Sequence, residues 1–229
     1  MDDYMTYYML TFLAFIITMS AQLYIKIIYS RYSRIRCSSG FTGARTAAEI
    51  LLRNGITDVR VVQVNGYLSD HYDPRNSTVS LSQNNYASDS LASVAVASHE
   101  CGHVLQDKEN YSFLRIREKI IPVVNFSSFA GYLAIMIGIL FELMDLIWMG
   151  IFMECIILAF QIITLPIEFD ASRRALNEIE QYGFVSYEEL KGARKVLTAA
   201  ALTYVAGVAS TVLEIMRLII MFGGRRRDD

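Results

Sequence analysis

The stretch Val94–Asp107, VAVASHECGHVLQD, places His99 and His103 four positions apart. In a helix, residues at this spacing project from one face, and two imidazoles there bind one Zn²⁺ at about 2.0–2.1 Å each. Glu100 then points toward a water on that metal and takes its proton. Because the chain has 3 histidines in 229 residues, the pair predicts a zinc site with one ion per chain, rather than a helix that carries two histidines by chance.

The flanking residues predict that this stretch is a helix. Ser88, Asp89 and Ser90 offer side-chain oxygens for an N-terminal cap, and small and apolar residues follow them. Gly102 is unfavourable in a helix interior by roughly 1 kcal/mol. A close approach of backbone or substrate beside the metal would account for it.

The composition indicates a membrane protein. Hydrophobic residues make up 53% of the chain, charged residues 19%, and the mean hydropathy is +0.32. The net charge of −2 gives no reason to expect nucleic acid as a partner. Three cysteines, Cys37, Cys101 and Cys155, form no pair spacing, so no disulfide framework is expected and a reducing compartment is favoured.

Residues 1–29 are predicted to form a first transmembrane helix, because Tyr4–Ile25 carries no charge and is long enough to span about 30 Å. A signal peptide is the competing interpretation, but Asp2 and Asp3 stand where its basic region belongs. Four basic residues follow the span: Lys26, Arg31, Arg34 and Arg36. They predict an external amino terminus and a cytoplasmic location for the next segment.

Residues 30–119 are expected to form a cytosolic metallopeptidase portion that carries the histidine helix. An amphipathic helix is predicted over Thr42–Leu52, ending at Asn54-Gly55. A β-branched run at 59–64 and an alternating run at 78–82 predict a small sheet or hairpin.

The segment Leu68–Arg75 between these strands is dense in potential ligands and has two interpretations. It is either a polar turn with its corner at Asp73-Pro74, or part of the active-site wall or substrate groove through His71, Asp70 or Asp73. The sequence does not separate them.

Residues 120–167 are predicted to form a transmembrane hairpin of two apolar arms, with Glu142 and Asp145 at its turn. Both ends of the hairpin then return to the side of the zinc motif. Glu154 lies inside the second arm, where an ionisable residue is a candidate functional group. The alternative is a shorter or tilted arm in which Glu154 reaches the interface.

The distribution of charged residues divides the remaining chain into three segments. Residues 168–195 are expected to form a cytosolic helical segment, 196–222 a fourth transmembrane helix packed by small residues, and 223–229 a basic tail. Glu214 and Arg217 interrupt the fourth helix, and a full span would place Arg225, Arg226 and Arg227 outside, against the positive-inside trend. The alternative is a helix that lies along the bundle or is only partly inserted. The fold class is therefore mainly α, with multi-pass transmembrane helices and a small cytosolic α+β portion.

The order of these motifs resembles the bacterial membrane neutral zinc metallopeptidases of the YugP type. Five stretches carry the resemblance: LSDHYDPR at 68–75, LS at 81–82, ASHECGH at 97–103, LPIEFDASRRAL at 165–176 and TAAALTYVA at 198–206. It implies a multi-pass protease of the bacterial cell membrane with a zincin-like cytosolic portion.

The resemblance also implies that a glutamate downstream of the histidines completes the metal site, as in membrane-bound gluzincins. Glu168 is that residue. It follows the end of the predicted hairpin, which returns it to the level of the zinc helix. The alternative is an interfacial glutamate that caps the helix that follows. Gluzincins place an aspartate four residues later; here that position is Ser172, and the nearby acid is Asp170, expected to pair with Arg173 or Arg174.

The predicted function is that of a membrane-embedded, zinc-dependent endopeptidase whose active site faces the cytoplasm. Its substrates are peptides or proteins, with membrane proteins among the candidates, and cleavage within the membrane and cleavage beside it both remain open. His99, His103 and Glu168 would bind Zn²⁺, and Glu100 would act as general base. The strand 79–82 is a candidate to pair with the substrate backbone. The alternative function is a non-enzymatic scaffold or transporter-like bundle that holds a structural metal.

Overall fold

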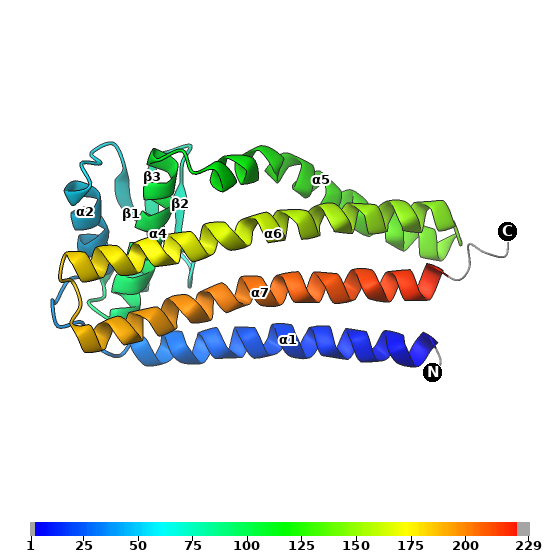
Figure 1. Cartoon of the computed structure of the whole chain (residues 1–229), viewed down its shortest axis with the longest axis horizontal. Coiled ribbons are helices and arrows are strands. Elements are labelled where there is room, and N and C mark those ends of the chain that lie inside the picture. Colours follow the sequence, from blue (N-terminus) through cyan, green and yellow to red (C-terminus); the bar gives the residue numbers. More distant parts are fainter. Residues whose placement is uncertain (1–2, 224–229) are drawn as a thin grey trace. The chain divides into compact units, whose positions relative to one another are not determined.

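The computed structural model describes residues 3–223, which are mainly helical (Figure 1). The helices are α1 (Asp3–Tyr32), α2 (Gly43–Arg53), α3 (Gln83–Ala87), α4 (Leu91–Lys108), α5 (Ser112–Leu140), α6 (Met144–Gln181) and α7 (Tyr187–Gly223). The strands are β1 (Arg60–Val64), β2 (His71–Asp73) and β3 (Thr78–Ser82). The basic tail expected at 223–229 lies outside the described residues from 224 onward.

The chain divides into two compact units. The helical unit comprises Met1–Gln22, Arg115–Leu165 and Thr203–Asp229, and the mixed unit comprises Leu23–Leu114 and Pro166–Leu202. Helices α1, α5, α6 and α7 each contribute residues to both units.

The helical unit draws on four helices that are long and apolar enough to cross a membrane. Gly131 of α5 and Gly150 of α6 allow two backbones to approach closely, since a Cβ on Gly150 would lie 3.0 Å from the Gly131 carbonyl oxygen. A small core forms between α6 and α7, where Ile147 and Leu218 are buried. Many large apolar side chains of this unit remain exposed, among them Phe12, Phe129, Leu140 and Phe152.

The mixed unit contains a three-stranded sheet in the order β1-β3-β2. Strand β1 pairs parallel to β3, with Val62 opposite Ser80, and β2 pairs antiparallel to β3, with Tyr72 opposite Val79. Every residue of β3 is buried, as befits a strand with a neighbour on each side. Because β1 pairs along all of β3 and β2 along residues 78–80, β3 has little free edge, and the expectation that this strand binds the substrate backbone is not supported.

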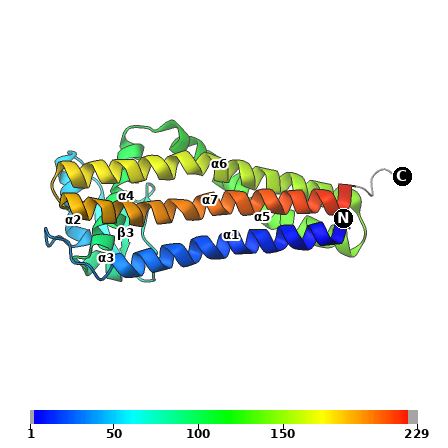
Figure 2. The same cartoon turned by 60° about the horizontal axis from the view of Figure 1, so that its bottom comes forward.

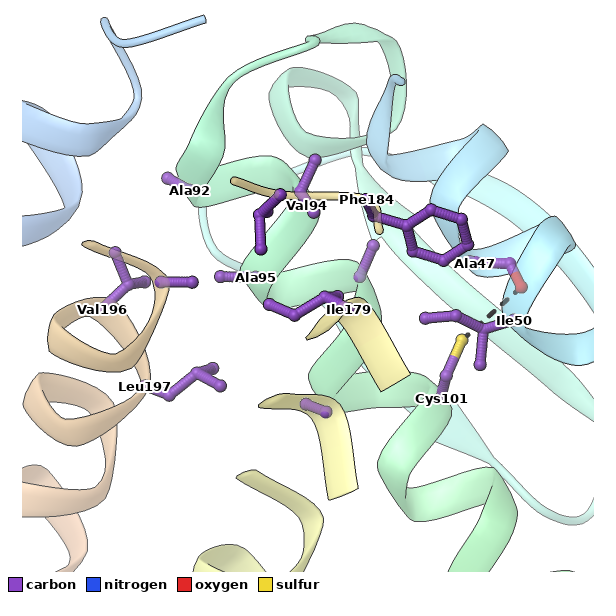
Figure 3. Packing of buried hydrophobic residues seen from close by; sticks show 14 of the residues in the cluster. Ala47, Ile50, Ala92, Val94, Ala95, Cys101, Ile179, Phe184, Val196 and Leu197 are labelled. Atoms are coloured by element: carbon purple, nitrogen blue, oxygen red, sulfur yellow. Dashed lines mark hydrogen bonds between the residues drawn. The ribbon is translucent and has the colours of Figure 1, made fainter. Parts of the chain in front are cut away.

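The core of the mixed unit forms around α4. Its apolar side packs with α2 and with the mixed-unit parts of α6 and α7, through fully buried residues such as Val94, Ile50 and Ile179 (Figures 2 and 3). Helix α2 begins after Thr42, whose hydroxyl oxygen accepts from the Arg45 N–H, and ends at Asn54. The predicted helix at 42–52 and strand at 78–82 are confirmed.

Two of the predicted segment boundaries, at 167/168 and 195/196, fall inside continuous helices. Helix α6 continues through Pro166 to Gln181, and α7 runs from Tyr187 to Gly223 without a break near residue 196. Proline removes one backbone donor, but the neighbouring turns of a long helix tolerate that loss. The change from apolar to charged sequence therefore marks a change of surroundings along one helix rather than its end.

Candidate metal centre

Helix α4 carries the two histidines on the side opposite its apolar core. It begins after Ser90, whose hydroxyl oxygen accepts from the Ser93 N–H at 3.2 Å, so the predicted N-terminal cap and helix are confirmed. Gly102 lies against α6, where a Cβ would stand 2.4 Å from the Ala171 carbonyl oxygen. The glycine therefore permits the close backbone approach that the sequence suggested.

Three potential ligands converge where α4 meets α6. The ligand atoms of His99, His103 and Glu168 all lie within 4.8 Å of one another. The Glu168 Oε2 atom is 3.3 Å from His99 Nε2 and 3.7 Å from His103 Nε2. The Glu168 side chain is 3% exposed, and those of His99 and His103 are 15% and 12% exposed. A buried carboxylate between two imidazole nitrogens is a donor set that fits Zn²⁺ and leaves a coordination position open.

The outer nitrogens of both imidazoles have polar neighbours. His99 Nδ1 lies 3.2 Å from Ser172 Oγ, and His103 Nδ1 lies 3.0 Å from Gln106 Oε1. These contacts leave both Nε2 atoms directed at Glu168. Ser172, four positions after Glu168, is thus the neighbour of His99 Nδ1.

Glu100 lies next to this cluster and is 7% exposed. Burial raises the pKa of its carboxyl group, and the neighbouring imidazoles of His99 and His103 partly offset that effect. Glu100 is thus a buried carboxyl group beside two candidate metal ligands.

Asp170 is not a member of the ligand group, and it contacts the group through Gln106. Its carboxylate accepts from Gln106 Nε2 at 2.9 Å and from Arg174 Nε at 2.6 Å, and it also pairs with Arg173. The expected pairing of Asp170 with the two arginines is confirmed. Arg174 also forms an ion pair with Glu109, with Nη1 2.8 Å from Oε2.

The segment at 68–75 is not brought into the ligand group. His71 is exposed, with Nδ1 2.8 Å from the Ser69 carbonyl oxygen. Asp73 accepts from the Arg75 N–H and from Asn76, as in a polar turn. Asp70 accepts from the Ser82 N–H at 2.8 Å and from Asn85, so it fixes the start of β2 against the end of β3.

Cys101 faces the opposite side of α4. Its Sγ atom lies 3.7 Å from the Ala47 carbonyl oxygen (Figure 3), and burial raises the pKa of the thiol. Cys101 is therefore outside the candidate ligand group.

Comparison with known proteins agrees with this geometry. A family model described as "Putative neutral zinc metallopeptidase" matches residues 7–223. The chain belongs to this family. It is 44% identical over 218 residues to the "Putative membrane protease YugP" of Bacillus subtilis (strain 168), covering 95% of this chain and 97% of that relative. No solved structure matches the chain at a significant level.

Sequence reasoning missed Gln106 as a partner of the metal site. The signal was available, because Gln106 lies three positions after His103 and such residues are neighbours on a helix surface. Its partners on α6 could not be read from that spacing.

Proposed function

We propose that this protein is a membrane-embedded, zinc-dependent endopeptidase with one zinc ion per chain. The convergence of His99, His103 and Glu168 carries the proposal, since these residues come from two helices and meet as one donor set around a buried carboxylate. Membership of a zinc metallopeptidase family supports it.

His99, His103 and Glu168 would hold the ion. When bound, zinc supplies a Lewis acid that makes water nucleophilic near neutral pH and polarises a peptide carbonyl. Glu100 takes the proton from the attacking water and delivers it to the leaving amine. The apolar surroundings of α4 keep these groups in a fixed geometry, which lowers the cost of ordering them for the reaction.

A structural metal in a scaffold protein is the less supported function. Structural zinc sites close four protein ligands, commonly with cysteine among them. Among the described residues the ligand group has three members, and Cys101 faces the Ala47 carbonyl oxygen on the other side of the helix.

Strand β2 is the better candidate for pairing with a substrate backbone. Among the described strands it pairs on one side with β3, and it also contacts α4, since the Tyr72 hydroxyl donates to Asp107 Oδ2 at 2.7 Å. An extended peptide adds to such an edge through main-chain hydrogen bonds. We propose that the substrate binds there, next to the metal helix.

The test compares the purified protein with its Glu100→Gln variant. The variant should keep about one zinc per chain and its thermal stability, while turnover of a peptide substrate falls by roughly 10²- to 10⁴-fold, because the glutamate is a base and not a ligand. Metal content is measured by elemental analysis. Loss of zinc with the carboxylate would refute the role of Glu100, and a wild-type protein that neither binds zinc nor gains activity from it would refute the function.

A further inference from the structure

Gln106 is a fully buried amide whose hydrogen bonds are all accounted for. It is 0% exposed. Its Nε2 atom donates to the Ile167 carbonyl oxygen at 2.8 Å and to Asp170 Oδ2 at 2.9 Å, and its Oε1 atom lies 3.0 Å from His103 Nδ1. Both amide protons are therefore used on α6, and the amide oxygen is left for the imidazole.

The orientation of this amide follows from its partners. A main-chain carbonyl oxygen and a carboxylate oxygen both only accept, so the NH₂ group has to face them. Arg173 and Arg174 pair with Asp170 and keep it an ionised acceptor. A flipped amide would place its oxygen against two other oxygens.

The fixed amide determines which nitrogen of His103 carries the proton. Gln106 Oε1 can only accept, so Nδ1 of the neutral imidazole has to be the protonated nitrogen. Nε2 then keeps its lone pair and points toward Glu168, 3.7 Å away. Ser172 cannot fix His99 in this way, because a hydroxyl group both donates and accepts.

We infer that Gln106 is a positioning residue for the metal centre: held by Ile167 and Asp170, it fixes His103 in the tautomer whose Nε2 binds the ion. This inference rests on the proposed zinc site. Outer partners of metal-binding histidines orient the ring and raise its basicity, and losing one costs typically 10- to 100-fold in metal affinity.

The experiment measures zinc affinity by competition with a chromophoric chelator in four proteins: wild type, Gln106→Met, Gln106→Glu and Ser172→Ala. Gln106→Met keeps the volume but removes the acceptor, so affinity should fall about 10- to 100-fold. Gln106→Glu should recover part of it, because a carboxyl oxygen accepts the same Nδ1 proton, although the residue no longer donates to Ile167 or Asp170 and meets their oxygens instead. If Gln106 only bridged α4 and α6, Gln106→Glu would lose as much affinity as Gln106→Met, and that result overturns the inference.

Histidine ¹⁵N NMR of the zinc-loaded proteins gives a second readout. The wild type and Gln106→Glu should show a protonated, slowly exchanging Nδ1 on His103, and Ser172→Ala should leave that signal in place while altering His99. A His103 protonated at Nε2 overturns the inference even if Gln106→Met does not fold. A wild type that binds no zinc refutes the proposed function instead, whereas tight zinc binding unaffected by Gln106→Met refutes this inference alone.

Discussion

Glu168 and Asp170 are two acids on the same turn of α6 with different surroundings. Glu168 faces both imidazoles, whereas Asp170 faces Gln106 and two arginines. We expect Glu168→Gln to weaken zinc binding by more than the roughly 10- to 100-fold typical of an outer partner, and Asp170→Asn to stay within that range. Chelator competition measures both affinities. Equal losses in the two variants, or none for Glu168→Gln, would remove Glu168 from the ligand set.

Gly102 makes a second prediction at this scale. Alanine is the better helix former by about 1 kcal/mol, but at this position its Cβ would collide with the Ala171 backbone. We expect Gly102→Ala to destabilise the fold by about 1–3 kcal/mol and to weaken zinc binding, because α4 and α6 must move apart.

Gly207 is the matched control, since a Cβ there meets nothing within 4 Å. Gly207→Ala should therefore leave thermal unfolding unchanged or shift it upward. A Gly102→Ala protein as stable as Gly207→Ala would contradict the close packing of the two helices.

The local part of the site was predictable from the sequence, and the part that crosses helices was not. His99, Glu100 and His103 share one helix, so their spacing alone relates them. Glu168 was reached only through the resemblance and the return of a membrane hairpin. The contacts of Ser172 and Gln106 depend on how α4 and α6 pack together, and that packing rests on Gly102, whose neighbour on α6 no spacing rule identifies.

Among the elements, the sheet shows where sequence patterns stop being informative. Alternating and β-branched runs predicted the strands at 59–64 and 78–82, but not the short strand β2 or the central position of β3. Pairing order depends on long-range contacts that a local pattern does not contain. Strand β2 is three residues long and lies at an edge of the sheet. Most of the polar segment 68–75 is therefore turn, and its composition does not reveal the short strand within it.

The placement of β2 gives the prediction at this scale. The Tyr72 hydroxyl ties β2 to the end of α4 through Asp107. The Tyr72→Phe variant lacks this hydrogen bond, which contributes about 0.5–1.5 kcal/mol to holding β2 in place. If the substrate pairs with β2, its binding is weakened by that free energy, so we expect KM for a peptide substrate to rise about 2- to 10-fold with zinc affinity unchanged.

Asp107→Asn should produce a smaller change in KM in the same direction, because the acceptor stays but loses its charge. Steady-state kinetics on zinc-loaded protein provide the values. An unchanged KM in Tyr72→Phe, or a drop in kcat alone, would count against substrate pairing with β2.

At the scale of the whole molecule, the arrangement of charge along the chain predicts its orientation in a membrane. Four described helices are long and apolar enough to span a bilayer. Basic residues lie in the last part of the first helix and just after it, at Lys26, Arg31, Arg34 and Arg36, whereas the acids Glu142 and Asp145 lie in the α5–α6 turn and the first turn of α6. Because basic residues favour the cytoplasmic side, we expect the metal centre to face the cytoplasm and the α5–α6 turn to face outward.

Cysteine accessibility tests this orientation. A Cys155→Ala background is needed, because Cys155 is exposed while Cys37 and Cys101 are buried. A membrane-impermeant thiol reagent applied to intact cells should label engineered cysteines at Asp3 and Asp145 and spare one at Asn76. Asn76 is exposed in the turn before β3, so permeabilising the cells should restore its labelling and show that the membrane, not the fold, protected it. If the cysteine at position 76 is labelled in intact cells while those at positions 3 and 145 are protected, the protein has the opposite orientation and the proposed peptidase site lies outside.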